Sequence, residues 1–288
     1  MDETMTCNTC DVPGRASTAS EAIKARSNVR EFGSETFTVW RCDNCRSIHA
    51  LESVDLARYY RNYPVHNQKL DIFTRALLLS RLALIARFGL KKSHSILDYG
   101  CGKGLFVDYL KSKHFDAHGY DPYSDLYNQP ISPAAKFDVV TSDQVIEHAS
   151  DPAAMIQEWS NHVKPGGLLF ISCPNGDAID LRQPEKFIHE LHQPYHRHLL
   201  SPQALVDLSR KAGFKHVQTI SSSRNWTPFL NWSFLCAYMQ KTGGFLDAVY
   251  EEPNYKLISS SPKLLAKGLM GGWIPCRTLM ICAFIKES

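Results

Sequence analysis

From residue 95 onward, the chain alternates short, mainly apolar runs with longer stretches of mixed apolar and polar residues. The short runs predict buried strands, and the longer stretches predict helices with one buried face. Strands are expected near residues 95–99, 116–120, 137–141, 167–173, 216–222 and 278–286. This alternation is typical of an α/β fold, in which a mostly parallel sheet carries helices on both faces.

Two helices are expected ahead of the first strand. One spans residues 53–63 and ends before Pro64, and the other spans about residues 69–88 and ends at Gly89. A later segment, residues 223–277, is rich in aromatic residues and too long for an ordinary connection. We expect it to form a helical lid or substrate-binding subdomain, or alternatively the contact face of a homodimer.

The segment Ile96–Leu110 is typical of a buried strand, a glycine-rich turn and the start of a helix. Gly100, Gly102 and Gly104 leave this turn without side chains at alternate positions, and the following helix would point unpaired N–H groups at a ligand there. The dinucleotide fingerprint G-x-G-x-x-G is not met, because Leu105 stands where its third glycine belongs. The turn is therefore expected to bind a cofactor other than a dinucleotide.

The pattern D-x-G-x-G-x-G at residues 98–104 resembles the first motif of the class I S-adenosylmethionine-dependent methyltransferases. Residues 119–122, 137–152 and 163–175 resemble the successive later motifs of the same family. Within them, residues 145–152 are similar to the ubiquinone-type O-methyltransferases. The resemblance implies a Rossmann-like sheet and S-adenosyl-L-methionine as the methyl donor.

The same resemblance implies which residues hold the donor. The glycines would admit it, Asp98 would orient its ammonium end, and Asp121 would accept hydrogen bonds from its ribose hydroxyls. The implied cofactor-binding residues are Asp98, Gly100, Gly102, Gly104, Asp121, Pro122 and Gln144.

Histidine suits the removal of a proton from an alcohol or phenol near neutral pH. The candidate catalytic residues are His148, which follows a strand expected to end at the pocket, and His196, in a segment resembling the family's H-x-x-x-F-S-P turn. Some ubiquinone-type relatives bind a divalent cation near the first of these, but Gln144 stands where an acid is expected, which disfavours a metal-assisted mechanism. His192 and His198 are expected to be polar loop residues.

Four of the nine cysteines form two C-x-x-C pairs, Cys7 with Cys10 and Cys42 with Cys45. This spacing lets each turn present two thiolates to a tetrahedral zinc ion, and a disulfide is the alternative. Thirty-one residues separate the pairs, so a longer hairpin than that of a compact zinc ribbon is expected between them. Four thiolates complete a closed site, so the zinc is expected to be structural and His49 is expected at the surface.

Four parts of the chain are expected: residues 1–52 as a zinc ribbon, 53–92 as a helical cover, 93–222 with 278–288 as the S-adenosylmethionine-binding core, and 223–277 as the insertion.

A formal net charge of +3 without a basic stripe disfavours nucleic acid as a partner. No secretory signal or apolar stretch of membrane-spanning length is apparent, so a cytoplasmic location is expected.

The expected function is methyl transfer to a small-molecule acceptor, on an oxygen of a sugar, a polysaccharide precursor or a secondary metabolite. A cysteine-rich amino-terminal segment ahead of such a domain resembles enzymes of these pathways. One alternative is an RNA base methyltransferase that contacts RNA through the ribbon. The other is a non-catalytic binding protein with the same fold.

Overall fold

The computed structural model describes residues 7–10, 19–61, 72–220, 228–273 and 276–288. Contacts group the chain into two units. The α/β unit holds residues 69–173, 205–220 and 280–288, and the cysteine unit holds residues 1–68, 174–204 and 221–279. This grouping does not test the four-part division expected from the sequence, which remains a prediction.

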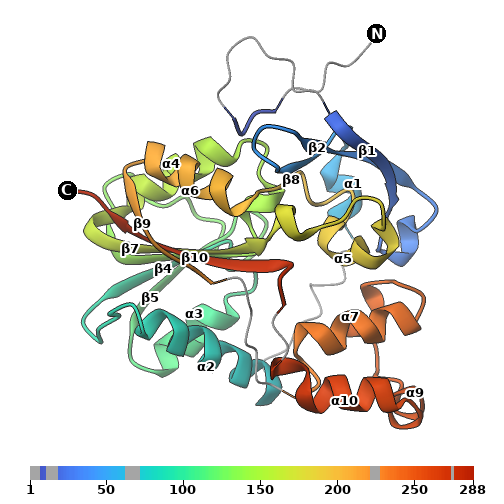
Figure 1. The fold of residues 1–288 in the computed structure, drawn as a ribbon. Helices are drawn as coiled ribbons and strands as arrows, with labels where there is room; N and C mark the ends of the chain where they lie inside the picture. The colour runs from blue at the N-terminus through green and yellow to red at the C-terminus, as the bar shows by residue number, and fades with distance from the viewer. Residues whose placement is uncertain (1–6, 11–18, 62–71, 221–227, 274–275) are drawn as a thin grey trace. The chain divides into compact units, whose positions relative to one another are not determined.

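A six-stranded sheet with the order β5-β4-β6-β7-β10-β9 forms the centre of the α/β unit (Figure 1). Its strands are β4 (Ser95–Tyr99), β5 (Asp116–Tyr120), β6 (Phe137–Asp143), β7 (Val163–Pro174), β9 (Phe214–Ile220) and β10 (Leu279–Lys286). Strand β4 pairs in parallel with β5 and β6, and β6 pairs in parallel with β7, whereas β10 runs antiparallel to β9. The expected α/β fold is confirmed, and the late strand β10 lies between β7 and β9.

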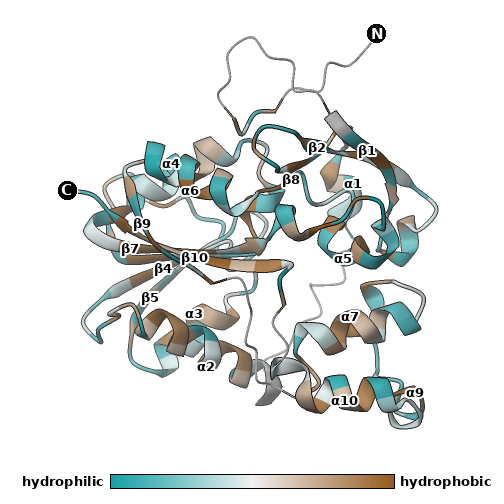
Figure 2. Cartoon of the chain, in the orientation of Figure 1, coloured by the Kyte–Doolittle hydropathy of each residue, from teal (hydrophilic) through white to brown (hydrophobic). Residues whose placement is uncertain are grey.

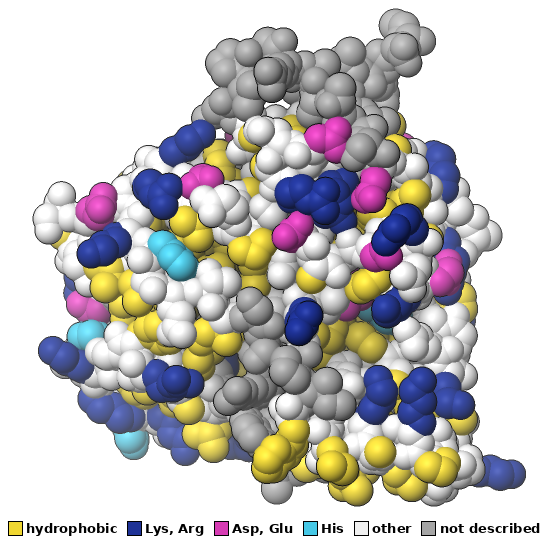
Figure 3. Space-filling view, viewed as in Figure 1, with side chains coloured by type: hydrophobic (Ala, Val, Ile, Leu, Met, Phe, Trp, Pro, Cys, Tyr) yellow, Lys and Arg dark blue, Asp and Glu magenta, His cyan; other side chains and the backbone are white. Residues whose placement is uncertain are grey.

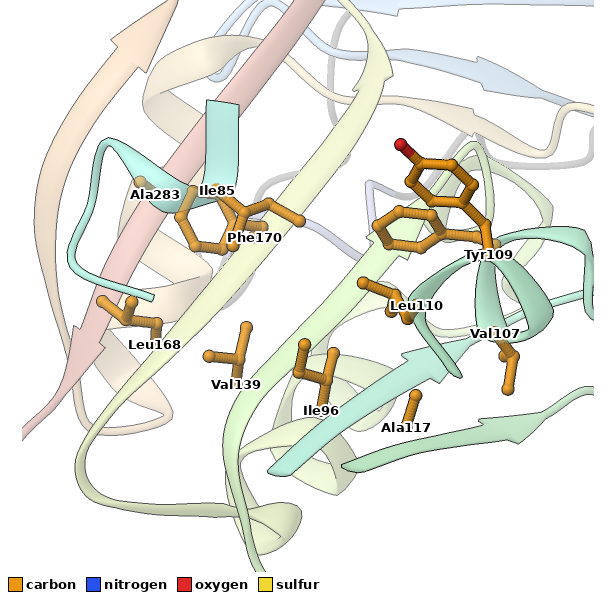
Figure 4. Packing of buried hydrophobic residues seen from close by; sticks show 11 residues of the cluster. Ile85, Ile96, Val107, Tyr109, Leu110, Ala117, Val139, Leu168, Phe170 and Ala283 are labelled. Carbon is orange, nitrogen blue, oxygen red and sulfur yellow. The ribbon is translucent and has the colours of Figure 1, made fainter. Parts of the chain in front are cut away.

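Helices cover both faces of this sheet. Figure 1 shows α2 (Ile72–Ala86) and α3 (Leu105–Ser112) on one face, and α4 (Pro152–His162) and α6 (Pro202–Lys211) on the other. Apolar residues concentrate on the strands, which appear brown in Figure 2. Figure 4 shows side chains from the first face packed together, among them Ile85, Leu110, Val139 and Phe170. Burial of these side chains supplies the main stabilising free energy of the unit.

The cysteine unit contains a four-stranded sheet with the order β1-β2-β3-β8. Its strands are β1 (Ala19–Arg26), β2 (Thr36–Cys42), β3 (Ile48–Ala50) and β8 (His198–Leu199), and each neighbouring pair is antiparallel. The short helices around it are η1 (Arg30–Phe32), α1 (Leu56–Tyr60), η4 (Gly176–Ala178), η5 (Pro184–Phe187) and α5 (Ile188–Leu191). Strand β8 joins the segment around His196 to the amino-terminal hairpin.

The expected helical insertion forms α7 (Trp232–Lys241), α8 (Asp247–Tyr250), α9 (Tyr255–Ser260), α10 (Pro262–Met270) and η6 (Gly271–Trp273). Phe234, Tyr238 and Leu264 are buried in its core. Asn231, Asn254 and Ser261 cap helices with side-chain oxygens, which accept backbone N–H groups of the first turns. Among the described helices, none combines the length and apolar character needed to cross a bilayer.

Candidate functional site

The glycine-rich turn joins β4 to α3. Gly100, Gly102 and Gly104 all have positive φ values, of 77°, 55° and 79°, which residues with a β-carbon rarely adopt. A β-carbon on Gly100 would lie 2.2 Å from Val145, and one on Gly104 would lie 2.2 Å from the ring of Tyr127, whereas one on Gly102 would have no neighbour within 4 Å. Two of the glycines therefore make room for protein side chains, and Gly102 faces open space.

Asp121 connects the end of β5 to this turn. Its carboxylate accepts a hydrogen bond from the N–H of Gly102 at 2.9 Å and another from the N–H of Tyr123 at 2.8 Å. Pro122 follows it on the exposed side of the same turn. The acid and the glycine turn are thus brought together, as the sequence motifs predict for one ligand-binding edge of a parallel sheet.

Asp98 lies inside the unit, one residue before the end of β4. Its carboxylate accepts hydrogen bonds from Arg81 at 2.7 Å and from the hydroxyl of Thr141 at 2.9 Å. Burial raises the pKa of Asp98, and the charge of Arg81 acts in the opposite direction. The guanidinium of Arg81 also lies 4.1 Å from the ring centroid of Phe106. Sequence reasoning missed Arg81, since an arginine in an amphipathic helix carries no motif.

The segment after β6 holds the next predicted residues. Gln144 has a positive φ of 57°, and its N–H donates to the carbonyl of Ser172 at 2.8 Å. Its exposed side-chain nitrogen lies 3.4 Å from the hydroxyl of the same serine. His148, half-buried, ends the short helix η3 (Ile146–His148).

Glu147, beside His148, is 1% exposed. Within the ranges that the structure describes, neither of its carboxylate oxygens has a hydrogen-bond partner. Burial raises the pKa of Glu147 to about 8. The side chain is therefore mostly protonated at neutral pH and can donate one hydrogen bond.

His196 belongs to the cysteine unit, while His148 belongs to the α/β unit. His196 is buried, and its Nδ1 lies 2.7 Å from the backbone carbonyl oxygen of Glu190. His192 lies in the loop after α5, as expected, but it is buried, with its Nδ1 2.5 Å from the side-chain oxygen of Asn28. The expectation that His198 is a loop residue is wrong, because it is buried and belongs to β8.

Glu190 is a buried acid that sequence reasoning missed. It is 4% exposed, and its Oε1 accepts hydrogen bonds from Trp232 at 3.2 Å and from Thr278 at 2.7 Å. Its Oε2 has no hydrogen-bond partner among the described residues, and the same is true of Nε2 of His189. Burial raises the pKa of Glu190 and lowers that of His189 to about 4. The sequence carried no clear signal, because α5 has only four residues and two of them, His189 and Glu190, are polar.

The four predicted zinc ligands lie together, with all four sulfur atoms within 4.8 Å of one another. The Sγ atoms of Cys7 and Cys45 are 3.6 Å apart, and those of Cys10 and Cys42 are 3.4 Å apart. A tetrahedron with Zn–S bonds of about 2.3 Å has edges of about 3.8 Å. The sulfur separations are therefore close to those that a zinc ion requires.

The expectation that His49 lies at the surface is wrong. His49 is buried, with Nε2 3.2 Å from the sulfur of Cys7 and Nδ1 2.9 Å from Nδ1 of His198. Pairing of β3 with β2 on one side and β8 on the other encloses its ring. A ring N–H directed at a thiolate is a typical contact of a metal ligand with its surroundings.

Comparison with known proteins places these features in a family. A family model described as a methyltransferase domain matches residues 70–219. Ubiquinone biosynthesis O-methyltransferase of Colwellia psychrerythraea is 29% identical over 148 residues, which cover 42% of this chain and 60% of that protein. The protein of the same name from Paracidovorax citrulli is 27% identical over 168 residues, which cover 48% of this chain and 71% of that protein.

One similar solved structure is phosphoethanolamine N-methyltransferase 2 of Haemonchus contortus in complex with S-adenosyl-L-methionine. Its TM-score is 0.50 at 16% sequence identity, with 84% of this chain and 62% of that chain covered. A likeness at this identity shows the fold alone. The family model spans half of the chain and includes the glycine turn, Asp121 and His148. The chain therefore belongs to the methyltransferase-domain family.

Proposed function

We propose that the donor binds at the glycine turn of the α/β unit. Gly102 offers open space, and its N–H and the carboxylate of Asp121 already lie together at this edge. Asp121 would bond the ribose hydroxyls, while Pro122 and Gln144 would border the nucleoside. Asp98 would act on the amino-acid end together with Arg81, to which it is hydrogen-bonded. These contacts would orient the donor for in-line transfer.

We propose further that the acceptor is a small molecule methylated on oxygen. The observation that carries this proposal is that Oε2 of Glu190, inside the cysteine unit, has no hydrogen-bond partner among the residues that the structure describes. A buried carboxyl oxygen without a partner costs about 1–3 kcal/mol, and an acceptor hydroxyl would supply the missing donor. The names of the similar curated proteins, ubiquinone biosynthesis O-methyltransferases, also support an oxygen acceptor.

When bound, the donor would supply a methyl group to the acceptor oxygen, and its sulfur would keep the electron pair of the broken carbon–sulfur bond. The hydroxyl proton of the acceptor would pass to a base of this chain. His148 and His196 are the proposed bases, because a neutral imidazole accepts a proton near pH 7. Glu190 would bind a hydroxyl group of the acceptor within the cysteine unit, which favours polyhydroxylated molecules such as sugars.

The cysteine cluster is proposed to hold a structural zinc ion. Cys7, Cys10, Cys42 and Cys45 have the donor chemistry and the sulfur separations of a closed tetrahedral site. His49 would donate a hydrogen bond to a bound thiolate and, through His198, would connect the site to β8. The ion would thereby stabilise the strand that follows His196.

The test is a methyl-transfer assay with donor labelled on the methyl group. The full chain is offered separately a panel of free and nucleotide-linked sugars, a panel of catechols and phenols, and total RNA. Label in a small molecule, located on oxygen by mass spectrometry, supports the proposal. Label only in RNA would overturn it in favour of RNA base methylation.

A pair of variants then tests the role of Glu190. We expect Glu190→Gln to raise the KM for the acceptor about tenfold or more, with unchanged donor affinity. The control is Glu185→Gln on the same segment, because Glu185 is largely exposed and pairs with Arg26. Equal kinetics for both variants would remove Glu190 from the acceptor site.

A further inference from the structure

The helices α9, α10 and η6 carry large apolar side chains that are exposed. Tyr255 is 73% exposed, Leu269 is 62% exposed, Met270 is 64% exposed and Trp273 is 72% exposed. Leu269 and Trp273 are four positions apart, so they lie on one side of a continuous helical segment. The opposite side of α10 is already used, because Leu264 is buried in the core of the insertion. Leu269 and Met270 therefore point away from the buried side of α10.

Close packing fixes this orientation of α10. A β-carbon on Gly268 would lie 2.3 Å from the ring of Phe229, and one on Gly271 would lie 2.2 Å from the side chain of Asn231. The side-chain nitrogen of Asn231 also donates to the carbonyl of Lys267 at 2.9 Å. The helix cannot rotate to bury Leu269 and Met270 without breaking these contacts.

All the charged residues of the same segment are basic. Residues 255–273 contain Lys256, Lys263 and Lys267 and no aspartate or glutamate, although the whole chain is nearly balanced, with 32 basic and 29 acidic residues. Figure 3 shows hydrophobic side chains along the lower edge of the molecule, beside lysine or arginine and without acidic side chains among them. The face thus combines aromatic and aliphatic anchors with positive charge.

We propose that this face docks on the surface of an anionic lipid bilayer. Tyr255, Leu269, Met270 and Trp273 would enter the boundary between headgroups and acyl chains, where amphipathic aromatic rings are favoured. Lys256 and Lys263, both exposed, would lie among anionic headgroups, whereas Lys267 is partly buried with its Nζ 3.5 Å from the carbonyl oxygen of Ser233. The lysines argue against a second copy of the chain as the occupant, because a two-fold contact would bring like charges together.

Vesicle flotation of the full chain, without donor or acceptor, tests this docking independently of the proposed reaction. We expect binding to vesicles of phosphatidylcholine with one-third phosphatidylglycerol, and much weaker binding to phosphatidylcholine alone. Each of Lys256→Gln and Lys263→Gln should weaken binding about fivefold. The double variant L269Q/M270Q should abolish it. The matched control is L79Q/L126Q, which removes two exposed leucines of the α/β unit, 55% and 76% exposed, and should bind as the parent does.

Two results would overturn the proposal: absence of binding to the anionic vesicles, and equal loss of binding in L269Q/M270Q and in the control. If vesicle binding is absent and sedimentation velocity shows a concentration-dependent dimer that L269Q/M270Q disrupts, the face is instead a contact between copies of the chain. Circular dichroism and thermal melting of each variant show whether the insertion is still folded.

Discussion

Replacing Asp121 with alanine is expected to weaken donor binding strongly with little effect on folding. The carboxylate accepts two backbone hydrogen bonds, at 2.9 Å from Gly102 and 2.8 Å from Tyr123, and it is partly exposed. Water can replace it at those two N–H groups, so the cost to stability should be about 1 kcal/mol.

The cost to donor binding should be larger. A charge-assisted hydrogen bond contributes about 1.5–3 kcal/mol, so the loss of one bond to the ribose raises the Kd of the donor about 10- to 150-fold. Titration calorimetry with S-adenosylmethionine and S-adenosylhomocysteine measures this change, and thermal melting measures stability. The control is Asp125→Ala, because Asp125 is an exposed acid on the same turn and should leave the Kd unchanged.

An unchanged Kd in a folded Asp121→Ala protein would refute the ribose assignment. Equal losses in the two aspartate variants would refute it as well, since they would indicate a general effect of negative charge. A large fall in melting temperature would show instead that the two backbone hydrogen bonds hold the turn in place.

The other predictions concern the glycine turn, a buried acid and the cysteine cluster. Gly104→Ala should lower the free energy of unfolding by several kcal/mol, because its β-carbon would overlap Tyr127. Gly102→Ala should cost only about 1–2 kcal/mol of backbone strain but should weaken donor binding. Denaturant unfolding measures the first effect and calorimetry the second, and equal stability of the two variants would contradict the packing. Because the folded pKa of Glu147 is raised from 4.5 to about 8, the unfolded chain releases its proton first, and stability should fall by up to about 1.4 kcal/mol per pH unit between those values. Glu147→Gln should remove that slope in melts from pH 5 to 8, and identical slopes would contradict the burial of a protonated acid. Elemental analysis should find one zinc ion per chain. A chelator or the Cys10→Ser substitution should remove the ion and lower the melting temperature. A protein that is fully stable without metal would count against the site.

Much of the α/β unit could be predicted from the sequence because its signals are local. The alternation of strand-length and helix-length segments predicted all six strands of the sheet, and the spacing of Gly100, Gly102 and Gly104 identified the turn between β4 and α3. The C-x-x-C pairs likewise identified four cysteines that the structure brings together. In each case the feature is set by neighbours within a few positions along the chain.

Only the tertiary structure showed which distant side chains meet. Arg81 bonds Asp98 from another element, Tyr127 fills the space beside Gly104, and His49 is enclosed because β8 pairs with β3. Glu190 depends on Trp232 and Thr278, which lie 42 and 88 positions away. Such contacts arise when burial removes polar groups from water and each must find a partner wherever the fold supplies one. The sequence by itself therefore determined the elements and the motifs, while packing decided the partners of the buried polar groups.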